Sequence, residues 1–353
     1  MSSLLWMEYE DAFQDLAADA FRRACRKDPS YYSSLTPRAF GIIRRDTRYN
    51  VDFLYTAYLL GEDKIMEDYA VWLYQLMASV LRGKIPEEKT EVYVLEHLDT
   101  IRQSVKETTP EPLHPQLLRL MDLADEAVRR AARQPLPEIR RPCRYEAEVD
   151  QYMDSILHRN GRRAAALIHE FVEKGISLND IYVEILAESM RRVGELWHTA
   201  QITVDAEHYC TSATQMAMSQ LYPLLFATER RHKTLLCACP GTELHEMGAR
   251  MVADLFENDG WDSIYLGAAV PEDALLDAVA SSHPDLIALS VTMPQHLMAC
   301  RDVVISIRAH YPDARIAVGG RAFESTHELW KQWPVDLYTT DARQLLAQAN
   351  QLC

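Results

Sequence analysis

The sequence lacks the segments that would take a chain into or across a membrane. No stretch of about 18 uncharged apolar residues occurs in its 353 residues, so no membrane-spanning helix is expected. Residues 1–8 have no basic start followed by an apolar run, so no secretion signal is expected. The seven cysteines are scattered and odd in number, which favours reduced thiols over a disulfide framework. These absences predict a cytoplasmic protein.

Positive charge is also scarce. The chain has 37 Lys and Arg residues against 52 Asp and Glu residues, a net charge of -15. An acidic surface repels phosphate backbones, and no run of Lys and Arg is typical of a DNA-reading helix. We therefore expect no direct DNA-binding domain.

The first block, residues 1–135, shows no alternation of period two. Its apolar residues recur at three- and four-residue spacing, which predicts an all-helical N-terminal domain. The expected helices span residues 5–26, 51–60, 64–81, 87–105 and 115–133. A segment with three prolines, residues 134–142, predicts an extended linker to the next block.

The second block, residues 144–230, is again helical. Short connections between its periodic segments imply antiparallel neighbours and hence a four-helix bundle. The expected helices span residues 146–160, 161–174, 177–199 and 204–226.

The third block, residues 232–353, alternates short apolar runs with helical segments. Continuously apolar strands at this spacing predict a doubly wound parallel sheet of the Rossmann-like, flavodoxin type, so the whole chain is α plus α/β. The expected strands span residues 234–239, 261–266, 286–290 and 315–318, and the expected helices 244–259, 273–281 and 299–310. Ligands bind such sheets beyond the carboxyl ends of the strands.

Informative residues follow three of these strands. Glu243-x-His245-x-x-Gly248 follows the first, and an acidic residue two positions before a histidine can fix its tautomer and make it a better donor to a metal. Gly248 would let backbone or a long ligand arm pass closely. Ser290-Val291-Thr292 follows the third strand, and Gly319-Gly320 follows the fourth, where the glycines open space that a side chain would block.

The combination resembles the cobalamin-binding Rossmann domain, whose pattern is D-x-H-x-x-G, then S-x-L or S-x-T, then G-G. This resemblance implies that His245 coordinates cobalt from below. It also implies that the dimethylbenzimidazole tail of the cofactor lies beside residues 290–292 and 319–320. The sequence departs from the usual pattern by having Glu243 in place of Asp.

A second constellation lies in the predicted bundle: Trp197-His198, then eight residues, then Glu207-His208. By itself it is typical of helix ends. Beside the third block it resembles the CarH-type cobalamin photoreceptors, and the combined match covers residues 145–325. The resemblance implies that Trp197, Glu207 and His208 surround the adenosyl group of adenosylcobalamin. It also implies that His198 can replace that group on cobalt after light breaks the cobalt–carbon bond.

The same resemblance predicts a light sensor rather than an enzyme. Light would change the assembly of a homo-oligomer, a dimer or tetramer, and so signal to a partner protein. Two alternatives remain open: a corrinoid methyl-carrier protein of a methyltransferase system, and cobalamin storage or sensing without light. The constellation of Trp197-His198 and Glu207-His208 argues against the methyl carrier, since a carrier needs an open upper face for its partner enzymes.

The aromatic residues of the first block allow two interpretations. One is a packed helical interaction domain. The other is a pocket for biliverdin, with arginines pairing to its propionates, which would resemble the photocobilins. The aromatic residues are Tyr31, Tyr32, Tyr49, Phe53, Tyr55, Tyr58, Tyr69, Trp72 and Tyr74, and the arginines are Arg38, Arg44, Arg45 and Arg48.

Overall fold

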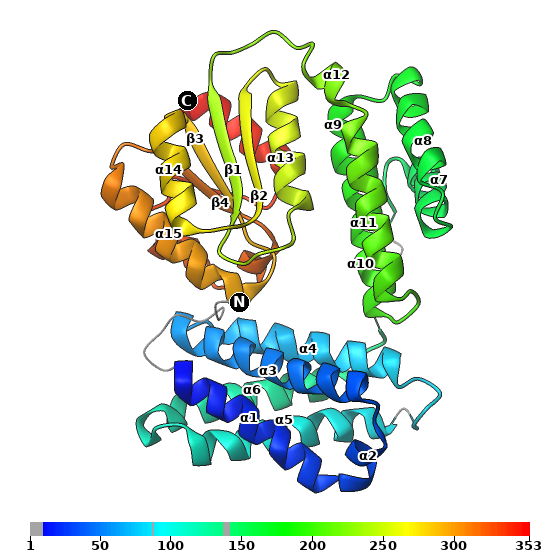
Figure 1. Cartoon of the computed structure of the whole chain (residues 1–353), viewed down its shortest axis with the longest axis vertical. Coiled ribbons are helices and arrows are strands. Elements are labelled where there is room, and N and C mark those ends of the chain that lie inside the picture. Colours follow the sequence, from blue (N-terminus) through cyan, green and yellow to red (C-terminus); the bar gives the residue numbers. More distant parts are fainter. Residues whose placement is uncertain (1–9, 87, 137–141) are drawn as a thin grey trace. The chain divides into compact units, whose positions relative to one another are not determined.

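The computed structural model describes residues 10–86, 88–136 and 142–353. The chain forms two compact units (Figure 1). Unit 1 comprises Met1–Leu136 with Ser325–His327, and unit 2 comprises Pro137–Glu324 with Glu328–Cys353.

Unit 1 is helical in its described part of the first block, as predicted. Its elements are α1 (Glu10–Lys27), α2 (Pro29–Ser34), α3 (Pro37–Leu60), α4 (Asp63–Val80), α5 (Glu88–Thr108), η1 (Glu111–Leu113) and α6 (His114–Ala131). The prediction for α3 was too short, because this helix begins at Pro37 rather than at residue 51. Thr36 caps it by accepting a hydrogen bond from the Ala39 N–H, and Pro37 occupies the first turn, where its missing N–H costs nothing.

Several aromatic residues of the first block form the core of unit 1. The rings of Phe53 and Tyr69 stack with centroids 3.9 Å apart, and Phe13 packs on Tyr55 at 4.0 Å. All four of these rings are buried. The Tyr69 hydroxyl donates to Asn50, whose amide lies 2.7 Å from His97 Nε2. Burial lowers the pKa of His97 to about 4, so this core histidine is neutral at physiological pH.

The bundle of unit 2 has the helices expected, but two of them are interrupted. Its elements are α7 (Glu146–Leu157), α8 (Gly161–Glu173), α9 (Leu178–Asp180), the π-helical η2 (Ile181–Leu186), α10 (Ala187–His198), α11 (Val204–Ser219) and α12 (Tyr222–Leu225). The segment predicted as one helix over 177–199 therefore contains a π-helical turn. The helix predicted over 204–226 breaks before Pro223, which cannot donate a backbone hydrogen bond to the preceding turn.

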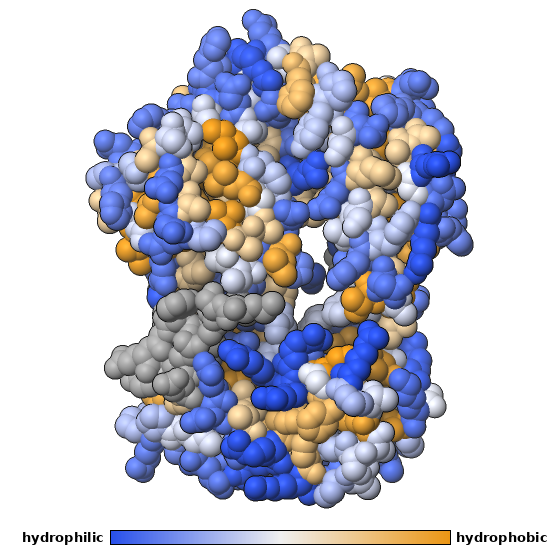
Figure 2. All heavy atoms as spheres, in the orientation of Figure 1, coloured by the Kyte–Doolittle hydropathy of each residue, from blue (hydrophilic) through white to orange (hydrophobic). Residues whose placement is uncertain are grey.

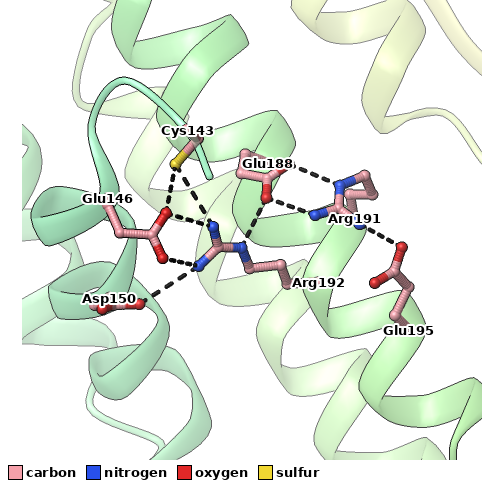
Figure 3. Close-up of polar contacts among 7 residues, drawn as sticks. All are labelled: Cys143, Glu146, Asp150, Glu188, Arg191, Arg192 and Glu195. Atoms are coloured by element: carbon pink, nitrogen blue, oxygen red, sulfur yellow. Dashed lines mark hydrogen bonds and ion pairs between the residues drawn. The ribbon is translucent and has the colours of Figure 1, made fainter. Parts of the chain in front are cut away.

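A buried arginine fixes α10 against α7 (Figure 3). The Arg192 side chain is only 5% exposed and pairs with Glu146 at 2.9 Å, Asp150 at 3.4 Å and Glu188 at 2.7 Å. Arg191 pairs on the same helix with Glu188 at 2.6 Å. A buried guanidinium is tolerated only when it is paired in this way. The cluster therefore holds in place the helix whose last turn carries Trp197 and His198.

The third block forms the predicted doubly wound sheet. All paired strands are parallel, in the order β2-β1-β3-β4-β5, which is the flavodoxin order. The strands are β1 (Thr234–Pro240), β2 (Asp262–Val270), β3 (Leu286–Ser290), β4 (Ile316–Gly319) and β5 (Leu337–Tyr338). The helices are α13 (Met247–Asn258), α14 (Glu272–Ser282), α15 (Leu297–His310) and α16 (Ala342–Leu352). β5 and α16 were not predicted from the sequence. The chain reverses its winding between β1 and β3, and the loops after these strands carry the predicted site residues.

All seven cysteines lie in described residues, and none forms a disulfide. Four of them are buried: Cys210, Cys237, Cys239 and Cys300. Burial raises the pKa of each of these four thiols, so they stay protonated at neutral pH. No helix within the described ranges is long and apolar enough to span a bilayer.

Candidate functional site

The site is built on the loop between β1 and α13. Glu243 is fully buried in this loop, whereas the side chain of His245 is 57% exposed. One carboxylate oxygen of Glu243, Oε1, accepts hydrogen bonds from the His245 backbone N–H at 2.9 Å and from the ring Nδ1 at 2.7 Å. Because Nδ1 donates to the carboxylate, Nε2 is the ring nitrogen left to meet a ligand.

The other oxygen of Glu243 ties this loop to the next one. Oε2 accepts the backbone N–H groups of Thr292 and Met293, both at 2.8 Å, and the Glu243 carbonyl accepts from Ala269 N–H at 2.9 Å. One side chain thus joins the loops that follow β1 and β3. This cross-link was not predicted. It depends on the pairing of β1 with β3, which the motif around Glu243 does not indicate.

The electrostatics follow from these bonds. Burial acts to raise the pKa of Glu243, but the hydrogen bond from His245, the charge of His296 and backbone N–H groups outweigh it and bring the pKa to about 2. The hydrogen bond to Glu243 in turn raises the pKa of His245. The carboxylate therefore stays ionised and makes the imidazole a strong electron-pair donor.

The serine and glycine motifs meet at the ends of β3 and β4. Ser290 pairs with Gly319 across the sheet, and the Val291 N–H donates to the Gly319 carbonyl at 3.0 Å. A Cβ on Gly320, which has a φ of +97°, would lie 2.3 Å from the Val291 carbonyl oxygen. A Cβ on Gly319 would lie 2.4 Å from the carbonyl oxygen of Thr339. These glycines thus allow close approach of backbones within the sheet. We had expected them to open space for a ligand.

Gly248 behaves differently from the other two glycines. It lies in the first turn of α13, three residues after His245, and a Cβ there would meet no atom within 4 Å. Its surface is therefore open to an incoming group beside His245.

The bundle constellation is brought together at one end of the bundle. Trp197 and His198 lie in the last turn of α10, Glu207 lies in the first turn of α11, and His208 follows it. Glu207 accepts hydrogen bonds from Thr211 Oγ1 at 3.0 Å and is paired with His208 Nδ1. Residues 199–203 connect the two antiparallel helices, so the four side chains share one end.

This end of the bundle is electrostatically coupled to the sheet site. The hydrogen bond to Glu243 is the main cause of the raised pKa of His245, and the charge of Glu207 raises this pKa further. Further along α11, Gln215 Nε2 donates to Glu246 Oε1 at 2.9 Å, next to His245 in the loop. Figure 2 shows the surface of unit 2 hollowed between its sheet and its bundle.

Two segments of the chain match protein-family models. Residues 233–347 match a family described as B12 binding domain, and residues 148–222 match a second family with the same description. These segments contain the sheet site and most of the bundle. The two matches support the assignment of this chain to the cobalamin-binding proteins.

Its relatives include proteins of two kinds. The chain is 31% identical over 157 residues to the HTH-type transcriptional repressor CarH of Myxococcus xanthus, a match covering 44% of this chain and 52% of that protein. It is 23% identical over 165 residues to Monomethylamine corrinoid protein 1 of Methanosarcina acetivorans, covering 45% of this chain and 76% of that protein. The chain spans about half the length of the CarH protein that it matches.

A solved structure shares the fold. The monomethylamine corrinoid protein of Methanosarcina barkeri superposes with a TM-score of 0.52 at 19% identity, covering 59% of this chain and 99% of that one. The site residues fit a cobalamin. The ionised Glu243 directs Nε2 of His245 outward, and the open surface at Gly248 leaves room beside it.

Proposed function

We propose that this protein is a light sensor that binds adenosylcobalamin between the sheet and the bundle of unit 2. The observation that carries the proposal is that Trp197-His198 and Glu207-His208 lie at one end of the bundle, with the Glu207 charge acting on His245. The similarity to CarH supports the assignment. The protein is not proposed to be an enzyme.

Each part of the site has a role in this proposal. Nε2 of His245 would bind cobalt, and Glu243 would hold the ring through Nδ1. Gly248, residues 290–292 and residues 319–320 would hold the tail of the cofactor, with Gly320 keeping its backbone close to that of Val291. The cofactor supplies a cobalt–carbon bond that light breaks, and that chemistry belongs to the cofactor rather than to the protein.

The side chains of the bundle that face the cofactor would respond when light breaks its cobalt–carbon bond. Trp197, Glu207 and His208 would enclose the adenosyl group, and His198 would be the residue able to replace that group on cobalt after illumination. A shift of α10 and α11 then changes contacts between subunits of a dimer or tetramer. The output passes to a partner protein.

The test is illumination of the protein loaded with adenosylcobalamin in the dark. We expect green light to change the absorbance to that of a histidine-ligated corrinoid and to change the elution volume in size-exclusion chromatography. His198→Ala should photolyse without giving that spectrum. His169→Ala, which removes an exposed histidine of α8, should behave as wild type. The proposal fails if light leaves the protein unchanged, or if the His198→Ala product is the same as wild type.

A methyl carrier is the second candidate. It is supported by the monomethylamine corrinoid relative, of which this chain covers 76%. A methylcobalamin-loaded protein that transfers its methyl group to a thiol, without responding to light, would favour this candidate.

Biliverdin is proposed as a second chromophore in unit 1. The support is the exposed arginines of α3, namely Arg38, Arg44, Arg45 and Arg48, near partly buried aromatic residues. Phe53, Tyr55 and Tyr69 lie in the core, so the aromatic contacts would come from Tyr49, Tyr58, Trp72 and Tyr74. We expect added biliverdin to give a red absorption band that weakens in Arg44→Glu. The absence of any band would exclude it.

A further inference from the structure

We infer that the contact between Gln215 and Glu246 is the pivot that sets the spacing between α11 and the loop carrying His245. The inference rests on cobalamin binding at His245 and adds two positioning residues to that site. By holding α11 near His245, the pivot controls access to the upper face.

Glu246 is held tightly next to His245. Its N–H donates to the Leu244 carbonyl at 2.9 Å, and its own carbonyl accepts from the Arg250 N–H at 2.9 Å and the Tyr265 hydroxyl at 3.2 Å. A displacement of Glu246 is therefore passed directly to His245.

The Glu246 side chain joins two elements. Oε1 accepts from Gln215 Nε2 on α11 at 2.9 Å, and Oε2 accepts from the Tyr265 hydroxyl on β2 at 3.1 Å. The carboxylate also lies over Gly267, where a Cβ would be 3.3 Å from Oε2. All three side chains of this bridge are partly buried, so its hydrogen bonds are shielded from water.

One face of α11 lies toward the loop that carries His245. Glu207, Thr211, Gln215 and Ser219 recur every four residues and so lie on the same side of the helix. Ser219 accepts a hydrogen bond from Arg250 of α13 at 3.1 Å, and Gln215 donates to Glu246 of the loop at 2.9 Å. Gln215 thus fixes the middle of this face.

Because the pivot lies within α11, a tilt of the helix at this point moves the end of the helix that carries Glu207. Eight residues of helix separate Gln215 from Glu207, which is about 12 Å along the axis. A small tilt at Gln215 therefore moves the Glu207 end by more, toward or away from His245. A flat macrocycle above His245 would be enclosed only while this spacing is kept.

The experiment uses the full chain loaded with hydroxocobalamin, and measures how fast added cyanide replaces the upper ligand. We expect Gln215→Leu to speed the replacement about fivefold, the factor that corresponds to one ordinary hydrogen bond. The spectrum of the lower ligand should not change. Gln220→Leu is the matched control, because it makes the same substitution at an exposed position just after α11.

Three further variants sharpen the test. Glu246→Leu should exchange its ligand at least as fast as Gln215→Leu, because it also removes the bond from the Tyr265 hydroxyl, and the double variant should be no faster than Glu246→Leu alone. In Glu246→Gln, cyanide should replace the upper ligand at the wild-type rate, because the amide oxygen of the new side chain still accepts a hydrogen bond from Gln215. Additive effects, or equal rates in Gln215→Leu and Gln220→Leu, would overturn the inference.

Hydrogen exchange of the protein without cofactor separates this inference from the proposed function. The pivot predicts about fivefold faster exchange of the amides in loop 241–246 in Gln215→Leu than in Gln220→Leu. Equal exchange in the two variants contradicts the pivot, even if cobalamin binds. If wild type binds no cobalamin, the proposed function fails, while faster exchange in Gln215→Leu still supports the pivot as the contact that positions the loop.

Discussion

At the scale of single residues, Glu243 explains most of the site. Its two oxygens accept four N–H groups, from the His245 backbone and ring and from Thr292 and Met293. A buried carboxylate satisfied in this way stays ionised and fixes both the tautomer of the histidine and the distance between two loops.

Replacement of this carboxylate has a predictable effect on stability. In the folded protein the pKa of Glu243 is about 2, against an ordinary value of 4.5. Its ionised form therefore stabilises the fold above pH 4.5, by about 3 kcal/mol, and this stabilisation is lost as the pH falls toward 2. We expect Glu243→Gln to lower the free energy of unfolding by about 2–3 kcal/mol at pH 7, since its amide NH₂ cannot accept from Thr292 and Met293.

Urea unfolding between pH 7 and pH 3 measures this effect. The difference between wild type and Glu243→Gln should shrink as the pH falls below 4.5. Glu173→Gln, at an exposed position in α8, should cost almost nothing at any pH. A difference that does not depend on pH would mean that Glu243 is not ionised in the folded protein.

The glycines of the site give a second residue-scale prediction. Gly320→Ala should destabilise unit 2 by several kcal/mol, because of its φ of +97° and the 2.3 Å approach of Cβ to Val291. Gly248→Ala should leave stability unchanged or slightly raised, because its Cβ meets no atom and alanine favours a helix.

Cobalamin binding distinguishes these two positions further. Gly248→Ala should keep its free energy of unfolding yet bind hydroxocobalamin more weakly, because the added methyl group enters the space beside His245. Urea unfolding and absorbance titration measure the two effects. Unchanged cobalamin affinity in Gly248→Ala would show that the ligand does not pass Gly248.

Local sequence could predict part of this site. Glu243 and His245 are two residues apart, so their hydrogen bond follows from a short loop. The bonds to Thr292 and Met293 could not be predicted, because they depend on which strands are neighbours. The need for Gly320 likewise comes from Val291, which reaches it only through the pairing of β3 with β4.

At the scale of elements, α13 and the bundle meet through buried polar groups. The Tyr182 hydroxyl, in the π-helical turn η2, donates to Asp254 Oδ2 of α13 at 2.8 Å. Arg250 donates to the Tyr222 hydroxyl at 3.2 Å. Both Tyr182 and Asp254 are buried. Burial raises the pKa of Asp254 to about 6 from an ordinary 3.8.

The raised pKa of Asp254 predicts a stability effect of the opposite sign to that of Glu243. Its carboxylate is disfavoured in the fold, so stability falls as the pH rises from about 4 to about 6 and then levels off. We expect Asp254→Asn to remove this fall, because an amide keeps the bond from Tyr182 without charge. Relative to wild type, the variant should gain up to about 3 kcal/mol between pH 4 and pH 7.

Urea unfolding at several pH values between these limits measures the gain. Asp277→Asn, an exposed substitution on α14, is the control and should show no such trend. A constant difference between Asp254→Asn and wild type would contradict the raised pKa.

The presence of the helices could be predicted from the periodicity of apolar residues, whereas the interruptions within these helices could not. The π-helical turn at Ile181–Leu186 leaves no mark in the apolar pattern, and it places Tyr182 against Asp254 across the interface with the sheet. The start of α3 was missed because residues 37–49 are mostly exposed and thus show little apolar periodicity.

At the scale of the whole molecule, the alternation of strands and helices was enough to predict the doubly wound sheet. The strand order needs more than the rule that such sheets reverse at a switch point, because more than one doubly wound order obeys this rule. β5 was missed because it has only two residues, Leu337 and Tyr338, and α16 lies beyond it. No sequence pattern of this kind indicates the role of unit 1, because its aromatic residues fit a helical core as well as a chromophore pocket.

The central claim is that His245 binds cobalt through Nε2. It is tested most directly by electron paramagnetic resonance of the Co(II) form of cobalamin bound to the full chain. The account predicts nitrogen hyperfine triplets that become doublets when the protein is labelled with ¹⁵N-histidine, and no such splitting in His245→Ala. Triplets that persist in the labelled protein would show that the cofactor's own base remains the lower ligand, and would contradict the claim.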